Sequence, residues 1–411
     1  MLFSSLDLAP ELQQAIDACG YSQMTPIQER AIIPARRGKD LLANAQTGTG
    51  KTAAFALPIL QQMHDRPLHT PPGNARTLIL TPTRELAEQL AESTKRYAQF
   101  LPFSVTALYG GVKLGSQEKK LKAGVDILVS TPGRLLEHME QGNINLSDVE
   151  FVVLDEADRM LDMGFIADVE SILQKIQKKR QTLLFSATMS QAIKDLAGKL
   201  LTRHDVVSVA RQNAIADTIE HVVYPVEEDR KADLFADLLE EHNWFKVLVF
   251  TSTKAQADEL MDKLKPAKIK TAICHGDKSQ GSRRRAIADF KDAKVQVLIA
   301  TEVAARGLDI QGLEHVVNYN LPYLAEDYVH RVGRAGRAGE KGQAISFVSR
   351  EEERSLANIE RLIGNKIKRI KIPGYQVESR DTLLKNVKER RRPQRANKPT
   401  QTKIARNKPR R

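Results

Sequence analysis

The chain has little of what builds disulfide frameworks, metal clusters or membrane spans. Its 411 residues include two cysteines, Cys19 and Cys274, far apart in the sequence. They form no disulfide scaffold and no metal-ligand spacing, so we expect a reducing, cytoplasmic setting. No apolar run approaches the roughly 18 residues of a membrane span, and the first residues do not resemble a signal peptide. Aromatic residues are only 5% of the chain, so we expect stacking of bases on aromatic side chains to be minor.

Basic charge is concentrated at one end of the chain. Of the net charge of +12, residues 385–411 hold +11, from twelve Lys or Arg and one acid, so the rest carries +1 (12 minus 11). With almost no apolar content, this segment is expected to be a disordered tail. Such an arm gains affinity for nucleic acid by displacing counterions from phosphates. The alternative is a solvated tail that only aids solubility.

Short apolar runs alternate with amphipathic, helix-like stretches along the rest of the chain. This alternation, with fully apolar β-branched runs, predicts an α/β fold of parallel sheets covered by helices on both faces. Two sets of about six strands predict similar tandem domains, 1–209 and 219–373, joined by a linker at 210–218 and followed by the tail, 374–411. The runs lie at 40–45, 77–83, 105–110, 126–131, 151–156 and 182–188, and at 221–226, 246–251, 270–276, 295–301, 315–320 and 344–349.

The segment AQTGTGKT, residues 45–52, carries the clearest chemistry. It follows a predicted strand, precedes an apolar helix and matches the phosphate-binding pattern GxxxxGK[ST], with Ala45 in place of the first glycine. Its glycines let backbone N–H groups turn toward phosphates, its lysine reaches the β and γ phosphates, and its threonine hydroxyl holds Mg²⁺. A plain Gly-rich connecting loop would not require the Lys-Thr pair. The expected ATP-binding residues here are Thr47, Gly48, Thr49, Gly50, Lys51 and Thr52.

A second chemical segment, FVVLDEAD at 151–158, runs from an apolar strand directly into carboxylates. Ligands of parallel sheets sit at the carboxyl ends of strands, so Asp155 and Glu156 should emerge beside Thr52. We expect Asp155 to hold Mg²⁺, partly through water, and Glu156 to orient and deprotonate the attacking water. Asp158 should hydrogen-bond to another motif. A helix N-cap formed by Asp155 or Asp158 is the alternative, and it is compatible with these roles.

This DEAD segment, followed by SAT at 186–188, resembles the DEAD-box family of ATP-dependent RNA helicases. The motifs occur in family order from Phe3 to about Gly339. The resemblance implies two tandem RecA-like domains, with Ser186 and Thr188 coupling them together with Asp158 and His330.

Upstream, GYSQMTPIQ at 20–28 resembles the family's adenine-reading segment. The resemblance implies that Gln28 bonds the adenine edge, that Tyr21 packs near the base and that Phe3 stacks above it. An amide suits this role, because it satisfies both N6 and N7 of adenine.

Several loops that follow strands are implied by the resemblance to hold the RNA sugar-phosphate backbone. Taken singly, PTRELA (82–87) and TPGR (131–134) also fit strand-to-helix turns, with Thr83 and Thr131 as caps and Pro132 at a first helical position. The implied RNA-contacting residues are Pro82, Thr83, Arg84, Gly110, Gly111, Thr131, Gly133 and Arg134 in the first half, and Gly276, Arg283 and Thr301 in the second.

The second half has no phosphate loop, but HRVGRAGRAG at 330–339 places Arg331, Arg334 and Arg337 three residues apart. Three arginines so close require anions to face, although a solvated basic face is the alternative. By resemblance, Arg334 and Arg337 reach the γ-phosphate as arginine fingers.

The neighbouring segment ATEVAARGLDI, 300–310, is implied to place Gly307 near the nucleotide and Asp309 on the ATP ribose. Two residues depart from the family pattern: Ala335 replaces a usual Thr and Glu302 a usual Asp. Both neighbour key residues and so bear on coupling rather than on the activity itself. Within the family, residues 45–61 and the IPGY segment before the basic tail most resemble the bacterial RhlE-type subgroup, which implies structured RNA such as ribosomal precursors or decay intermediates.

Nucleotide and metal ligands are thus expected on the first domain and arginines on the second, so hydrolysis requires the domains to close. RNA lying across both would favour closure and, by linkage, raise ATP affinity. The family implies local separation of short RNA duplexes or remodelling of RNA–protein complexes. With no dimerisation signal in the sequence, we expect a monomer. An ATP-gated RNA clamp without unwinding is the alternative. A DNA helicase on the same core is a weaker one, because contacts to 2′-hydroxyls favour RNA.

Overall fold

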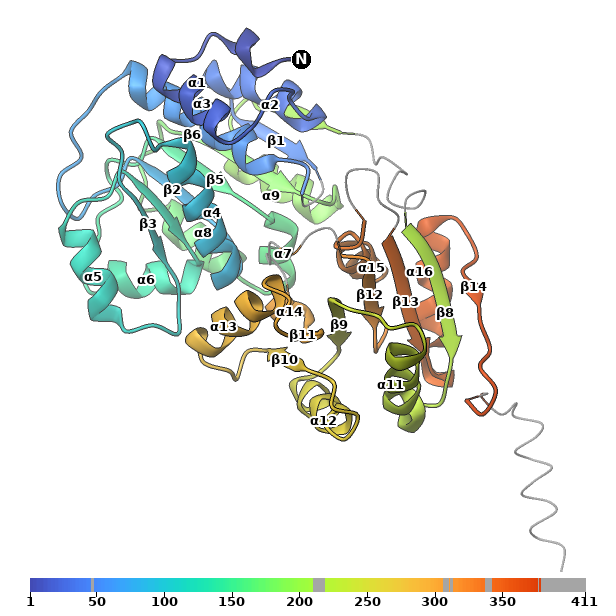
Figure 1. Cartoon of the computed structure of the whole chain (residues 1–411). Helices are drawn as coiled ribbons and strands as arrows, with labels where there is room; N and C mark the ends of the chain where they lie inside the picture. The colour runs from blue at the N-terminus through green and yellow to red at the C-terminus, as the bar shows by residue number, and fades with distance from the viewer. Residues whose placement is uncertain are drawn as a thin grey trace, which may run out of the picture.

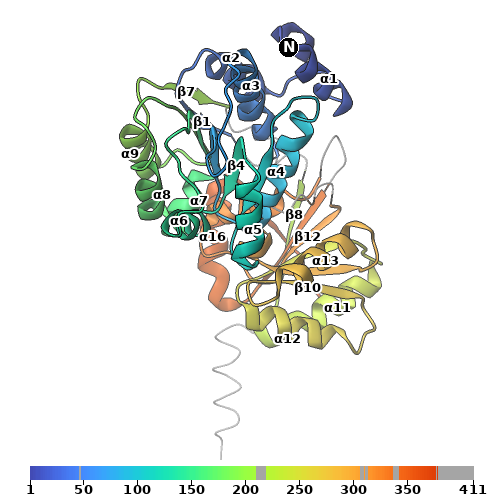
Figure 2. The same cartoon turned by 90° about the vertical axis from the view of Figure 1, so that its left-hand side faces the viewer.

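The computed structural model describes residues 1–45, 48–209, 219–305, 310, 313–336, 342–375 and 377. These residues form two α/β domains, blue to green and yellow-green to red in Figure 1; Figure 2 shows the first domain above the second. The predicted linker lies outside the described residues, as does nearly all of the predicted tail. No helix in the described ranges is long and apolar enough to cross a membrane.

In the first domain, strands and helices alternate along the chain. The strands are β1 (Leu41–Asn44), β2 (Thr77–Leu80), β3 (Val105–Leu108), β4 (Ile127–Ser130), β5 (Phe151–Leu154), β6 (Gln181–Ser186) and β7 (Asp205–Ser208). The helices are η1 (Phe3–Leu6), α1 (Pro10–Ala18), α2 (Pro26–Arg36), α3 (Lys51–Asp65), α4 (Arg84–Tyr97), α5 (Leu114–Lys122), α6 (Pro132–Glu140), α7 (Ala157–Asp162), α8 (Ile166–Leu173) and α9 (Gln191–Leu200).

The second domain repeats the alternation. Its strands are β8 (Ile219–Pro225), β9 (Val247–Thr251), β10 (Thr271–Cys274), β11 (Val297–Thr301), β12 (His315–Asn318), β13 (Gly342–Val348) and β14 (Lys368–Arg369). Its helices are η2 (Glu228–Arg230), α11 (Lys231–Glu241), α12 (Lys254–Leu264), α13 (Gln280–Lys291), α14 (Glu302–Ala305), α15 (Ala325–Val332), η3 (Arg350–Glu352) and α16 (Glu353–Ile363).

The two sheets share one topology. Their orders are β3-β4-β2-β5-β6-β1-β7 and β10-β11-β9-β12-β13-β8-β14, the same arrangement when strands are counted from the start of each domain. All strand pairs are parallel. The prediction of parallel α/β domains is confirmed, but each described sheet has seven strands rather than about six. The missed strands, β7 and β14, are short, exposed edges whose side chains lack the continuous apolar run of buried strands.

Each sheet is buried on both faces by separate apolar clusters. In the first domain, one cluster holds the buried sides of α2, α3 and α4, where Phe55 meets Phe185 of β6 edge to face, with ring centroids 5.4 Å apart. The other holds those of α6, α8 and α9. Because the strands are parallel, their carboxyl ends lie at one edge of the sheet, where the loops that follow β1, β2, β4 and β5 emerge together.

The domains touch through α4 and α13. Glu85 Oε1 lies 2.7 Å from Arg283 Nη2, and both side chains are buried. Next to them, Arg284 pairs with Glu88 and donates to the Tyr109 hydroxyl at 2.6 Å. A second link joins α7 to α15, where Arg159 pairs with Asp327. These contacts bring the loop edge of the first sheet against the second domain.

The second domain extends to Tyr375, two residues past its predicted end at 373. The Tyr375 hydroxyl donates to Asp237 of α11 at 2.5 Å, and the Arg230 guanidinium lies 4.7 Å from the ring centroid. Ile370 and Ile372 also pack on the core of this domain. The aromatic residue after Gly374 thus anchors the chain to the second domain just beyond the predicted boundary.

Candidate nucleotide site and RNA groove

The phosphate loop connects β1 to α3 and depends on glycine at two positions. Gly48 and Gly50 have φ of 81° and 89°, where side chains are strained. A Cβ on Gly50 would also lie 2.4 Å from Gln28 Nε2. Lys51, the first residue of α3, is 6% exposed, and its Nζ lies 3.6 Å from Asp155 Oδ1. Among the described residues this buried ammonium has no hydrogen-bond partner, which suits a site for phosphate oxygens.

Burial and nearby charges shift the pKa values of both Lys51 and Glu156. Burial alone would lower the pKa of Lys51, but the carboxylates Asp155, Glu156 and Asp158 outweigh it and the pKa is raised. Burial raises the pKa of Glu156, and the opposing charges of Lys51 and Arg334 only partly offset this. A buried carboxylate with a raised pKa is a better proton acceptor than an exposed one, as a general base requires.

Backbone geometry sets the acidic segment apart from an ordinary helix start. Glu156 has φ 54° and ψ 49°, the left-handed region, which a side chain occupies at a cost of order 1–3 kcal/mol. Glu156 also occupies the N-cap position of α7, with no side-chain capping bond. Asp155 Oδ1 accepts from the Glu156 backbone N–H at 3.0 Å. The capping alternative for Asp155 and Asp158 is therefore wrong, and the strained turn directs the carboxylates outward from β5.

Asp158 connects two motifs. Its Oδ2 accepts from the backbone N–H groups of Ala187 and Thr188, at 3.1 and 2.9 Å. Ser186 Oγ accepts from Thr188 N at 3.3 Å. The expected hydrogen bonds between Asp158 and another motif are present and tie the DEAD segment to the SAT segment.

At the adenine-reading segment, the structure differs from the expectation for Phe3. Phe3 is 1% exposed and belongs to the core, so it presents no face to a base. Tyr21, whose ring centroid lies 6.0 Å away, is 39% exposed and provides the aromatic surface. Gln28 Nε2 donates to the Gly50 carbonyl at 3.1 Å, and its Oε1 accepts from Thr25 N at 2.8 Å. The amide thus links the phosphate loop to the start of α2.

The second domain presents Arg334 at the end of α15, 8% exposed and close enough for its charge to act on Glu156. Arg331 has an internal role: it pairs with Glu302 and its Nη1 donates to the Asn320 carbonyl at 2.7 Å. The Glu302 departure thus retains a carboxylate partner for Arg331. Ala335 is buried in the core. His330 lies on α15 beside Arg331. The expected nucleotide residues Thr47, Gly307, Asp309 and Arg337 lie outside the described residues.

Two residues with oxygen donors that suit Mg²⁺ lie on either side of Lys51. Thr52 is the second residue of α3, next to Lys51, and Asp155 lies across from that lysine. One hydroxyl and one carboxylate fit an ion that keeps waters and shares phosphate oxygens rather than occupying an all-protein cage. The residues present fit the metal.

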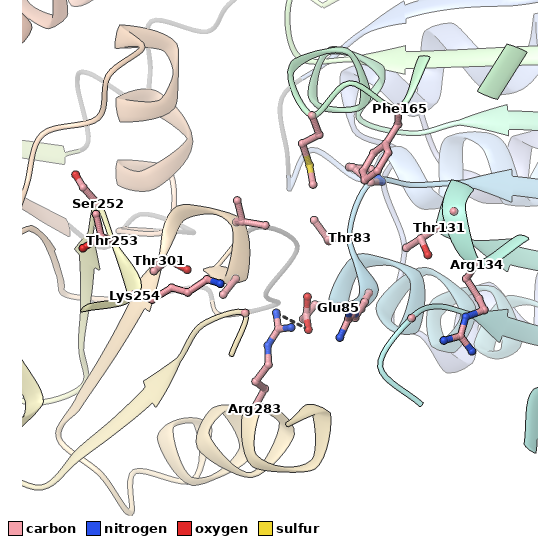
Figure 3. Close-up of a pocket in the computed structure, with 18 of the residues that line it drawn as sticks. Thr83, Glu85, Thr131, Arg134, Phe165, Ser252, Thr253, Lys254, Arg283 and Thr301 are labelled. Atoms are coloured by element: carbon pink, nitrogen blue, oxygen red, sulfur yellow. Dashed lines mark ion pairs between the residues drawn. The ribbon is translucent and has the colours of Figure 1, made fainter. Parts of the chain in front are cut away.

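A groove of about 1000 Å³ lies between the domains (Figure 3). Ten of the eleven expected RNA-contacting residues line it: Pro82, Thr83, Arg84, Gly110, Thr131, Gly133, Arg134, Gly276, Arg283 and Thr301. The remaining one, Gly111, supports Arg84, because a Cβ there would lie 2.1 Å from Arg84 Nη1. Loops far apart in sequence, and from both domains, thus face one cavity.

Several groove residues also have structural partners. Thr83 caps α4 by accepting from Leu86 N at 3.3 Å, so the turn interpretation and the groove position hold together. Arg283, expected on RNA, is paired with Glu85 in this arrangement. Arg134 Nε lies 2.8 Å from Glu137 Oε2. Arg283 and Arg134 are thus each held by a carboxylate, Glu85 or Glu137, that lines the same cavity.

Sequence reasoning missed part of the groove wall. Lys254 lines it from the start of α12, where it pairs with Asp277 at 2.5 Å. Its position just after β9 could have indicated it, since the other groove loops also follow strands. Phe165 and Val303 add apolar wall, and nothing in their sequence context distinguished them from core residues.

Comparisons with known proteins agree with this geometry. The family described as DEAD/DEAH box helicase matches residues 25–196, and the helicase conserved C-terminal domain matches residues 230–339. The chain belongs to the DEAD-box family of ATP-dependent RNA helicases. As such it is an RNA-stimulated ATP hydrolase, and the expected pair of RecA-like domains is confirmed.

Among its relatives, this helicase is 42% identical to the ATP-dependent RNA helicase RhlB of Pseudomonas aeruginosa (strain UCBPP-PA14), covering 89% of this chain and 93% of that one. It is 40% identical to CshA of Bacillus subtilis (strain 168), and the match covers 90% of this chain and 74% of that one. Among structures, S. cerevisiae Dbp5 bound to RNA and ADP BeF3 is 32% identical, with a TM-score of 0.80 over 94% and 99% of the chains. Mss116 bound to ssRNA and UDP-BeF is 26% identical, with a TM-score of 0.82, and the match covers 94% of this chain and 81% of that one.

Proposed function

We propose that this helicase hydrolyses ATP when RNA draws its two domains together, and that closure locally separates short duplexes or remodels RNA–protein complexes. The observation that carries the proposal is the groove built by both domains, with the residues expected to bind RNA facing one cavity. A strand bound across it stabilises the closed arrangement by its contacts to both sides.

The chemistry follows from groups at the domain junction. Lys51 supplies a buried cation with an unused donor for the β and γ phosphates. Glu156 accepts the proton of the attacking water, and Arg334 approaches from the second domain to stabilise negative charge that develops on the γ-phosphate. Mg²⁺ held by Thr52 and Asp155 would neutralise charge on the phosphate oxygens. Because Arg334 belongs to the other domain, the site is complete only when the domains meet.

The domain arrangement supports closure as the active step. The structure matches RNA- and nucleotide-bound Dbp5 with a TM-score of 0.80 at 32% identity. A DEAD box protein from Methanococcus jannaschii is closer in sequence, at 39% identity, yet matches with only 0.51 over 90% of this chain. The better match to the RNA- and nucleotide-bound structure, despite its lower identity, supports a domain arrangement like that of the bound form.

The substrates and setting proposed here rest on the sequence resemblance. We place the protein in the RhlE-type subgroup, acting as a cytoplasmic monomer on structured RNA such as ribosomal precursors or decay intermediates. RNA recognition is largely independent of sequence, since the groove presents hydroxyl, glycine and arginine groups suited to a sugar-phosphate backbone.

The test compares ATP hydrolysis without nucleic acid, with single-stranded RNA and with DNA of the same sequence. Stimulation by RNA alone, lost in Glu156→Gln, supports RNA-gated closure. Equal stimulation by DNA, or a high rate without either, contradicts it. A duplex-release assay with ATP then separates unwinding from an RNA clamp, which would hydrolyse ATP without releasing the strand.

A further inference from the structure

A buried glutamine outside every recognised motif connects the RNA-facing loops of the first domain. Gln117 of α5 is 3% exposed. Its Nε2 donates to the Tyr109 carbonyl at 3.0 Å, directly before the Gly110–Gly111 pair. Its Oε1 accepts from Arg134 Nη1 at 3.2 Å. One amide therefore bonds to both the loop after β3 and the helix that carries Arg134.

These bonds matter at this place because β3 is the edge strand of its sheet. The loop after it has a neighbouring strand on one side only, so its position depends on contacts from outside the sheet. The Tyr109 carbonyl is held by Gln117, and the Val112 carbonyl accepts from Arg134 Nη1 at 3.1 Å. Together the two bonds fix the ends of a four-residue turn that contains both glycines.

His138 fixes the orientation of the glutamine amide. This histidine of α6 is fully buried, and its Nε2 lies 3.1 Å from Gln117 Oε1. Burial and the Arg134 charge lower the pKa of His138, so the ring is neutral near pH 7. Asn143 Nδ2 lies 3.2 Å from Nδ1, which places the ring proton on Nε2, toward Gln117. The amide oxygen thus faces two N–H donors, and its nitrogen faces the Tyr109 carbonyl.

The same network restrains the Arg134 guanidinium. Nη1 is held by Gln117 Oε1 and the Val112 carbonyl, while Nε lies beside Glu137. Two bonds on Nη1 and the charge of Glu137 beside Nε restrain the group. An arginine restrained in this way loses less side-chain entropy when it binds a phosphate than a mobile one.

We propose that Gln117, oriented by His138, is a positioning residue for RNA: it holds Arg134 and the Gly110–Gly111 loop in the geometry that binds two points of one RNA backbone. The proposal rests on the RNA groove proposed above. Gln117 itself does not line the groove and acts through Arg134 and the loop.

The variant Gln117→Leu keeps the side-chain size and removes the bonds to Tyr109, Arg134 and His138. We expect the RNA concentration for half-maximal ATPase stimulation to rise roughly tenfold, as for loss of one charge-assisted contact. The rate at saturating RNA and the KM for ATP should stay within about twofold. Gln181→Leu is the matched control: Gln181 is another buried glutamine of this domain, bonded to the carbonyls of Ala35 and Lys39 at 2.7 Å. It should leave the RNA dependence unchanged.

A double-mutant cycle with Arg134→Ala distinguishes positioning from general destabilisation. If Gln117 acts through Arg134 as well as the loop, the loss in the double variant should be clearly smaller than the sum of the two single losses. Additive losses, or an equal shift in Gln181→Leu, overturn the proposal. If Gln117→Leu does not fold, Gln117→Asn serves instead, since its amide is one carbon too short to reach both partners. Absence of RNA stimulation in the unmodified protein would instead refute the proposed function itself.

Discussion

The carboxylate of Asp158 lies between the acidic segment and the SAT segment, and Asp158→Asn changes it with almost no change in shape. In the native protein Oδ2 accepts from Ala187 N and Thr188 N, and Oδ1 accepts from Arg159 N. An asparagine retains one acceptor oxygen but turns its NH₂ group toward a buried donor. Weakening two charge-assisted bonds costs about 0.5–1 kcal/mol each. The unsatisfied N–H adds about 1–3 kcal/mol, so the link between the two segments loses about 2–5 kcal/mol of stabilising free energy in total.

Because the weakened bonds join the two motifs and none of them reaches the phosphate loop, the change should affect coupling more than binding. We expect the number of duplexes released per ATP hydrolysed to fall by more than about tenfold, with the KM for ATP within about twofold. Parallel measurements of phosphate release and strand release on one duplex provide the ratio. Asp162→Asn is the control, since Asp162 is a 38% exposed residue of the same helix, and its pair with Arg159 contributes at most about 1 kcal/mol. Equal losses of hydrolysis and strand release in Asp158→Asn would refute the reasoning.

Three further substitutions test other contacts. Tyr109→Phe removes the bond to Arg284, so RNA-stimulated ATPase activity should fall about two- to fivefold. Burial raises the pKa of Tyr109 to about 12, so the ratio of native to variant activity should stay constant from pH 7 to about 10. A change of that ratio within this range would contradict the reasoning. Arg159→Ala and Asp327→Ala should show a coupling energy above about 1 kcal/mol in a double-mutant cycle of RNA-stimulated kcat/KM, whereas additivity would mean that this pair is absent in the active form. Thr52→Ala should raise the Mg²⁺ concentration for half-maximal ATPase by at least roughly tenfold, with the KM for RNA unchanged.

Strong local patterns in the sequence were sufficient to predict the phosphate loop, the acidic strand end and the groove loops. Each is a short motif at the end of an apolar run, so its place at the sheet edge follows from the parallel fold alone. The strands of the sheet interiors were found for the same reason. The edge strands β7 and β14 were missed because an exposed strand carries no apolar signature.

Other features depended on packing that a sequence does not display. Phe3 has the residue type for base stacking, but η1 turns it into the core against Tyr21. Arg283 carries the charge for RNA, but α13 places it beside Glu85 of the other domain. Gln117 belongs to no motif, and only the approach of α5 to α6 reveals its bonds. The positions of these side chains depend on neighbours that are distant in sequence, and local sequence patterns do not specify such contacts.

The shared strand order of the two sheets has a consequence for stoichiometry. β1 and β8 occupy the same place, and each leads through a loop into a helix that begins with lysine, Lys51 or Lys231. Lys51 has an unused donor, whereas Lys231 is fully buried and its Nζ lies 2.6 Å from both Glu228 and Glu352. In the second copy of the fold, the chain's own carboxylates thus neutralise the lysine that the first copy leaves available for phosphate. We therefore expect one nucleotide site per chain, on the first domain, although the two sheets share one strand order.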